Sequence, residues 1–186
     1  MRIVRIGCLA MATLFGARAA SNVVVYISAN KPIGPAEQVA ASIFAGVGIS
    51  VTWHRGEPAP GPPGSVVVRV DLSEDTPANC PLDTLALAHP YAGADKGITV
   101  FYKKLRQMAE TVVPEQLLLG HVLAHEIGHV LEGSDRHSQE GVMKAHWSYK
   151  DLYSMQDAPL RFAPEDADLL RRGLEWHNSL ARSFVH

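Results

Sequence analysis

The chain has 186 residues, of which 47% are hydrophobic, 19% charged and 7% aromatic, a composition typical of one globular domain with its own core. Lys and Arg number 17 and Asp and Glu number 19, so the formal net charge is −2, which argues against the basic surface that nucleic-acid-binding proteins need. No apolar run reaches the ~18 to 20 residues of a bilayer span, which argues against a multi-span membrane protein.

The first 20 residues have the pattern of a secretory signal peptide. Two arginines precede an apolar run over residues 6–16, and the alanines of the segment ARAA, residues 17–20, have the spacing of small residues that signal peptidase cleaves. An uncleaved membrane anchor is the alternative, but the apolar run is short for a span. We therefore expect residues 1–20 to be removed and the protein to be secreted or periplasmic, without stable membrane association.

The residues after this segment predict several strands and one early helix. Runs of β-branched and apolar residues favour strands, and clusters of Pro and Gly favour the turns between them. A helix is expected over residues 35–46, because Pro suits its first turn and Gly its end. The expected strands are residues 22–28, 49–54, 65–72, 85–91 and 97–102.

From residue 114 the pattern changes to helices. Residues 114–131 are apolar on nearly every side, as expected of a helix buried inside a domain. Gly133 is expected to end this helix in a left-handed conformation. A last helix is expected over residues 164–178, with Pro and acidic residues in its first turn. The fold class that follows is a mixed α and β architecture divided by a central helix.

This buried helix contains the motif His125-Glu126-Ile127-Gly128-His129. Residues four apart lie on one helix face with Cβ atoms about 5 to 6 Å apart, which lets both imidazoles reach one zinc ion at about 2.0 to 2.1 Å. Glu126 is placed to take a proton from water that such an ion makes acidic. Because burying two strongly hydrated side chains is costly unless something coordinates them, we expect a zinc site rather than two ordinary core histidines.

A third protein ligand is needed if one coordination position is to stay open for water. His137 is the best candidate, because it follows His125 by twelve residues and lies beyond the glycine expected to turn the chain. His146 and Glu140 compete with it for this role.

The segment HEIGHVLEGSDRHSQEGVM resembles the metzincin zinc endopeptidases, whose pattern is HExxHxxGxxH followed by a methionine-containing turn. In this chain the glycine comes one residue later and the last histidine two residues later, which gives HExxHxxxGxxxH. Residues 87–101 are similar to the edge-strand region of matrixin-type catalytic domains, and residues 161–174 are similar to their closing helix.

The resemblance implies an α+β fold of the zincin type, in which a twisted mixed sheet is combined with an active-site helix, a Met-turn and a C-terminal helix. It implies that the zinc ligands are His125, His129 and His137. It also implies Glu126 as general base and Met143 as the Met-turn residue. The function implied is that of a secreted zinc metalloendopeptidase, a hydrolase acting on protein or peptide substrates.

The same resemblance implies that three further residues lie around a substrate specificity pocket. His121 would line the primary specificity pocket, although simple burial accounts for it equally well. Trp147 and Tyr149, which follow the Met-turn, would form the far wall of that pocket. Aromatic residues at such positions also occur as ordinary core residues.

Two other functions remain open at the level of sequence. A three-histidine zinc endoribonuclease also has a Gly and an Asp before its last His, as Gly133 and Asp135 precede His137, but Glu126 and the export signal argue against it. The other is a secreted binding module that keeps zinc for stability alone. We expect the peptidase, with residues 21–186 as its catalytic domain.

Overall fold

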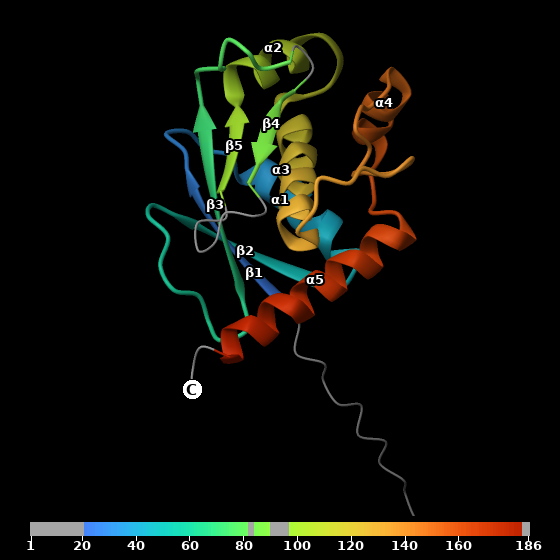
Figure 1. Ribbon diagram of the computed structural model, residues 1–186. Helices are drawn as coiled ribbons and strands as arrows, with labels where there is room; N and C mark the ends of the chain where they lie inside the picture. Colours follow the sequence, from blue (N-terminus) through green and yellow to red (C-terminus); the bar gives the residue numbers. More distant parts are fainter. Residues whose placement is uncertain (1–20, 82–83, 90–96, 184–186) are drawn as a thin grey trace, which may run out of the picture.

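A five-stranded sheet and five helices make up the part of the chain that the computed structural model describes, residues 21–81, 84–89 and 97–183 (Figure 1). The strand order is β2-β1-β3-β5-β4. Strands β2, β1, β3 and β5 run parallel to one another, and β4 runs antiparallel to β5. The elements in chain order are β1 (Ser21–Ser28), α1 (Gly34–Ala45), β2 (Ile49–Arg55), β3 (Val66–Ser73), β4 (Ala86–Ala88), β5 (Gly97–Phe101), α2 (Tyr102–Val112), α3 (Glu115–Glu132), α4 (Tyr149–Asp157) and α5 (Pro164–Ser183).

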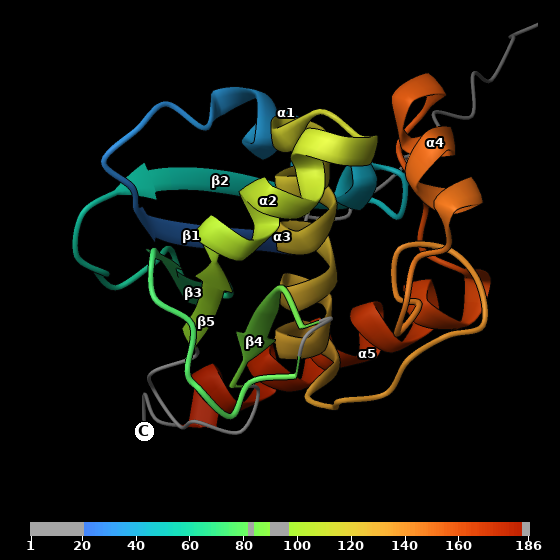
Figure 2. The same ribbon diagram turned by 90° about the horizontal axis from the view of Figure 1, so that it is seen from above.

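The core lies between the sheet and the helices α1 and α3, which lie next to each other (Figures 1 and 2). In β3 the buried residues Val66, Val68 and Val70 alternate with more exposed ones, because successive side chains of a strand point to opposite faces. The mixed α and β composition predicted from the sequence is therefore confirmed.

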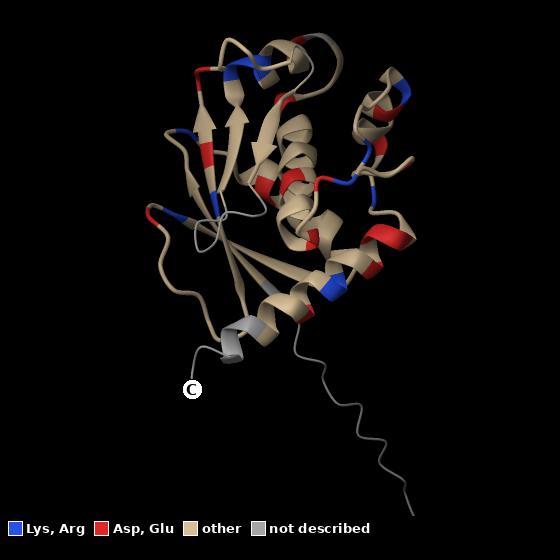
Figure 3. Cartoon of the chain, viewed as in Figure 1, with Lys and Arg blue, Asp and Glu red and all other residues tan. Residues whose placement is uncertain are grey.

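Helix α3 runs through the centre of the molecule. Every residue from Leu118 to Leu131 is buried, and among its 18 residues only Glu115, Glu126 and Glu132 are charged (Figure 3). Gly133 follows it with φ 63°, and its amide donates to the carbonyl of His129 at 3.0 Å. Glycine adopts this left-handed conformation without a Cβ penalty, so the predicted helix end is confirmed.

Two helices were not expected from the sequence. Helix α2 begins directly after β5 at Tyr102 and has no side-chain N-cap, so the usual start signals are missing. Helix α4 does carry such a signal, since Ser148 and Asp151 form a reciprocal capping box, the S/T-x-x-acid pattern that marks a helix start.

Some boundaries differ from the expectation, and the first segment cannot be compared. Strand β4 covers Ala86–Ala88, whereas residues 85–91 were expected, of which 90 and 91 lie outside the described residues, and α5 continues to Ser183. The signal segment, residues 1–20, lies outside the described residues. Within the described ranges, no helix combines the length and the apolar character that crossing a bilayer requires.

The crossing of α5 over the end of α3 gives a first prediction. A Cβ atom on Gly173 would lie 1.8 Å from the carbonyl oxygen of Leu131, so Gly173→Ala must push the two helices apart. We expect the free energy of unfolding to fall by about 1 to 3 kcal/mol, measured by urea denaturation. The matched control is Gly34→Ala, because no atom lies within 4 Å of a Cβ there; an equal loss in both variants would contradict the prediction.

Candidate metal centre

Three histidine side chains converge beside the C-terminal half of α3. The ligand-capable atoms of His125, His129 and His137 all lie within 4.8 Å of one another. The Nε2 atoms of His125 and His129 are 3.0 Å apart. The ring of His137 lies 5.3 Å from that of His125 and 4.9 Å from that of His129, centroid to centroid. The structure thus brings together the three side chains predicted as ligands.

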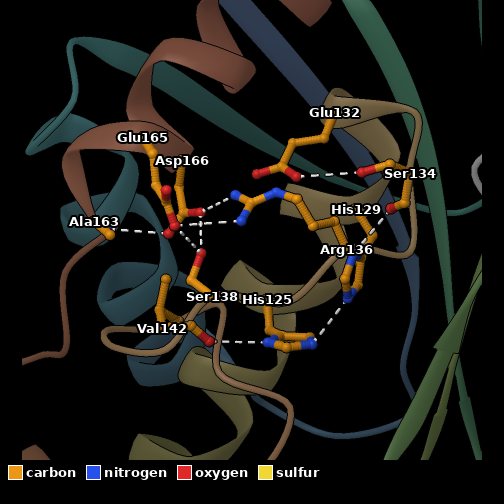
Figure 4. A network of polar contacts seen from close by, with 10 residues as sticks. All are labelled: His125, His129, Glu132, Ser134, Arg136, Ser138, Val142, Ala163, Glu165 and Asp166. Carbon is orange, nitrogen blue, oxygen red and sulfur yellow. Dashed lines mark hydrogen bonds and ion pairs between the residues drawn. The ribbon is translucent and has the colours of Figure 1, made fainter.

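The tautomers of the two helical histidines leave their Nε2 atoms unprotonated. Nδ1 of His125 lies 2.8 Å from the carbonyl oxygen of Val142, and Nδ1 of His129 lies 3.0 Å from that of Ser134 (Figure 4). A carbonyl can only accept, so each Nδ1 carries the hydrogen. The two Nε2 atoms therefore face each other as acceptors, an arrangement that a shared cation stabilises.

Burial also keeps these two rings neutral. It is the main cause that lowers the pKa of His125 to about 3 and that of His129 to about 4, and the neighbouring histidines lower both values further. Metal binding requires neutral imidazole. A set of three nitrogen donors suits Zn²⁺ and other divalent transition metals, so the residues present fit a metal ion.

The two competing third ligands do not belong to this cluster. His146 lines the same cavity as the three histidines, but it is not one of the residues whose donor atoms converge. Glu140 is exposed and likewise lies outside the group. Within the described residues, the geometry favours His137 as the third ligand.

Glu126 faces the same cavity as the three histidines. Its side chain is 8% exposed, and the backbone amide of Ala88 in β4 donates a hydrogen bond to its carboxylate. Burial raises the pKa of Glu126 to about 7, although the hydrogen bond from Ala88 acts in the opposite direction. The carboxyl group can therefore accept and release a proton near neutral pH.

The cavity has a volume of about 520 Å³ and lies between β4 and α3. Much of its wall is apolar, with Leu87, Met108, Val122, Trp147 and Leu152 among the lining residues. A space of this size that combines an apolar wall with convergent polar side chains is typical of a binding site for an organic ligand.

Met143 packs against α3 at Gly128, between His125 and His129 in sequence. Its side chain is fully buried, and a Cβ atom on Gly128 would lie 2.6 Å from its sulfur. The carbonyl of Met143 accepts a hydrogen bond of 2.8 Å from the amide of Ser138. Met143 thus supports the helix between the two histidines and ties its own segment to the loop that carries His137.

Of the three residues expected around the specificity pocket, only one lines the cavity. Trp147 lines the cavity, and its ring stands edge-on to His125 with 5.8 Å between centroids. Tyr149 is 71% exposed and does not line the cavity. His121 does not line it either: it is fully buried, with Nδ1 2.7 Å from the carbonyl of Leu117. For His121 the burial interpretation is therefore the better one.

The sequence interpretation missed a polar network beside the site, drawn in Figure 4. Asp166 of α5 is fully buried and accepts hydrogen bonds from Arg136 and Ser138, the residues on either side of His137. In the sequence, Asp166 is one of two acidic residues in the first turn of a helix. Such residues are usually explained by a favourable interaction with the helix dipole, so the sequence did not indicate a further role.

The chain was compared with protein-family models and with curated proteins, and neither comparison gave a match. The chemical interpretation of the site therefore depends on the geometry of these residues.

The burial of His121 gives a prediction about pH. Leu160 donates its amide hydrogen to Nε2 at 3.0 Å, so the folded state holds the ring neutral, and burial lowers its pKa. As the pH falls below about 6.5, the unfolded chain binds a proton there that the folded chain does not, and stability decreases. In EDTA, the stability advantage of the wild type over His121→Gln should shrink between pH 7.5 and pH 5, measured by urea denaturation. A constant difference would contradict this.

Proposed function

We propose that the protein is a secreted zinc-dependent endopeptidase. The observation that carries this proposal is that Glu126 faces the same cavity as the three converging histidines, beside an edge strand of the sheet. A metal site, a proton acceptor and a place for a peptide are the three parts that peptide hydrolysis needs.

Zinc is the metal proposed. Three protein ligands with an open fourth position are typical of catalytic zinc sites, and here the three imidazoles border an accessible cavity. A structural zinc site has four protein ligands and no open position. The open cavity therefore favours a catalytic role over a zinc ion kept for stability alone.

Strand β4 offers backbone groups to a substrate. The amide of His89 donates to Gly97 and the carbonyl of Leu85 accepts from Phe101, so these residues face β5. In an antiparallel pair the bonding direction alternates, and the polar backbone groups of Ala86 and Ala88 therefore face away from β5. The amide of Ala88 is hydrogen-bonded to Glu126, which leaves the amide and carbonyl of Ala86 and the carbonyl of Ala88 for a substrate. An extended peptide can add to this edge as a further strand, which would bring its backbone past Glu126.

The proposed chemistry uses few groups of the chain. When bound, the zinc ion would supply Lewis acidity, which polarises the peptide carbonyl and lowers the pKa of water, so that the water loses a proton readily and becomes a stronger nucleophile. The Glu126 carboxylate accepts the proton that this water loses as its oxygen bonds to the carbonyl carbon. Glu126 then delivers that proton to the amide nitrogen as the C–N bond breaks. Its pKa of about 7 suits both steps at neutral pH.

The arrangement of elements supports the same proposal. The long helix bearing the HExxH motif, Met143 packed beneath it and a closing helix agree with what the metzincin resemblance implies. We extend the proposal accordingly to a zincin-type catalytic domain over residues 21–186, preceded by a signal peptide and located outside the cell or in the periplasm.

The alternative as an endoribonuclease has less support. Lys144 lines the cavity, but the other Lys and Arg residues of the described ranges are spread over β2, β3, α2, α4, α5 and several loops instead of gathering there (Figure 3). RNA binding depends on such a gathering of positive charge. The proposed partner is therefore a protein or peptide substrate, without nucleic acid.

Glu126→Gln tests the proposed mechanism. The variant keeps the size of the side chain but cannot accept the proton, so cleavage of casein should fall by about 10²- to 10⁴-fold while the zinc content stays unchanged. Elemental analysis and a casein assay with and without EDTA measure both. Glu140→Gln is the matched control and should retain both properties. Wild-type activity in Glu126→Gln, or casein cleavage that resists EDTA, would contradict the proposal.

His137→Ala tests the ligand set. Removing one of three imidazoles should cause the protein to lose its zinc during dialysis, whereas His146→Ala should retain it, because His146 lies outside the converging group. Elemental analysis of both variants decides between the two residues. Zinc retained in His137→Ala and lost in His146→Ala would reverse the assignment.

A further inference from the structure

We propose that Asp166 of α5 is a positioning residue for the metal ligand His137, and that it acts by fixing the loop between α3 and Met143. This inference rests on the proposed metal site. It concerns a residue that lies 29 positions from the ligand in sequence and is not one of the three converging histidines.

His137 needs support from its surroundings more than the other two ligands do. His125 and His129 lie on a buried helix, and a backbone carbonyl orients each of their rings. His137 lies on a loop and is exposed, and within the described residues no hydrogen bond orients its ring. Its position therefore depends on how well its backbone is held.

Asp166 holds the loop on both sides of His137. One carboxylate oxygen, Oδ1, accepts a bond of 2.5 Å from Nη2 of Arg136 and a second bond from the hydroxyl of Ser138 (Figure 4). The other oxygen, Oδ2, accepts from the amide of Ala163 at 3.0 Å. A single carboxylate thus joins both neighbours of His137 to the start of α5.

Burial and charge make the hydrogen bonds of Asp166 strong and their geometry rigid. Asp166 is fully buried, and charge-assisted hydrogen bonds to a buried carboxylate are strong, with geometry that is hard to change. Arg136 is held a second time, because its Nη1 lies 3.3 Å from Glu165. Between His129 and His137 the chain has two more residues than the pattern HExxHxxGxxH, so the loop has more freedom for this network to remove.

A loop fixed in its binding position should bind metal more tightly, since less conformational entropy is lost when the third ligand engages. Replacing residues that orient metal ligands typically lowers metal affinity by about 10- to 100-fold. Asp166 should show an effect of this size although it is not one of the residues whose donor atoms converge.

The experiment measures the Zn²⁺ dissociation constant of the full chain by competition with a chromophoric chelator. Asp166→Asn should weaken binding by about 10- to 100-fold. The matched control, Asp168→Asn, removes an exposed carboxylate of the same helix that pairs with Arg171, and it should change the constant less than 2-fold. Equal affinity of Asp166→Asn and the wild type would overturn the proposal.

A double-mutant cycle separates positioning from general destabilisation. If Asp166 acts through His137, then Asp166→Asn should have almost no effect on Zn²⁺ affinity once His137→Ala has removed the ligand. The same loss in both backgrounds would overturn the proposal. The visible spectrum of the Co²⁺ form gives a second measurement, because Asp166→Asn should shift it towards the spectrum of His137→Ala, and an unchanged spectrum would count against positioning.

Ser138→Ala provides a milder variant if Asp166→Asn fails to fold. It removes one of the two bonds to Oδ1 and leaves Arg136 in place, so a smaller loss of Zn²⁺ affinity is expected, again absent in the His137→Ala background. An unchanged affinity in this folded variant would overturn the proposal. If the wild type itself binds no Zn²⁺, the proposed function fails; if it binds and the variants bind equally well, only the role of Asp166 is wrong.

Discussion

Two unprotonated imidazole nitrogens face each other 3.0 Å apart on the buried helix α3, and the rest of the site depends on this arrangement. Both Nδ1 atoms are occupied by backbone carbonyls, so neither ring can turn to donate to the other. Burial opposes protonation, which would otherwise relieve the repulsion between the two acceptors. A divalent cation would relieve it without adding a proton, which would offset the cost of placing such side chains in an apolar helix.

The fold surrounds this pair with parts that limit its movement. Met143 contacts α3 at Gly128, between the two histidines, where any larger side chain would collide with its sulfur. Strand β4 borders the cavity from the other side, and the amide of Ala88 orients Glu126. Precise sites in proteins are usually built on rigid elements that are supported by packing and hydrogen bonds. Here a helix, a strand and a packed methionine share that function.

The third histidine stands apart because it lies on a loop rather than on a rigid element. The network around Asp166 connects this loop to α5, so the last helix of the chain becomes part of the support of the metal centre. This connection also gives a physical account of the unusual ligand spacing. A longer loop is compatible with a well-formed site when buried charge-assisted hydrogen bonds remove the freedom that the extra residues bring.

The sequence by itself determined the features that depend on neighbours along the chain. The i, i+4 spacing placed His125 and His129 on one face of a helix, the apolar surroundings indicated that the helix is buried, and Gly133 marked its end. The capping box at Ser148 and Asp151 would also have revealed α4. Each of these signals lies within one or two helical turns, where backbone geometry fixes the distances.

Only the tertiary structure decided which distant groups meet. The bond from Ala88 to Glu126 and the bonds from Asp166 to Arg136 and Ser138 join residues about 30 to 40 positions apart. Such contacts depend on how the helices pack on the sheet, and a single sequence carries no periodic signal for them. The sequence already favoured His137 over His146, but only the folded loop shows that its ring converges with the other two, because the path of a loop is set by the elements that hold its two ends.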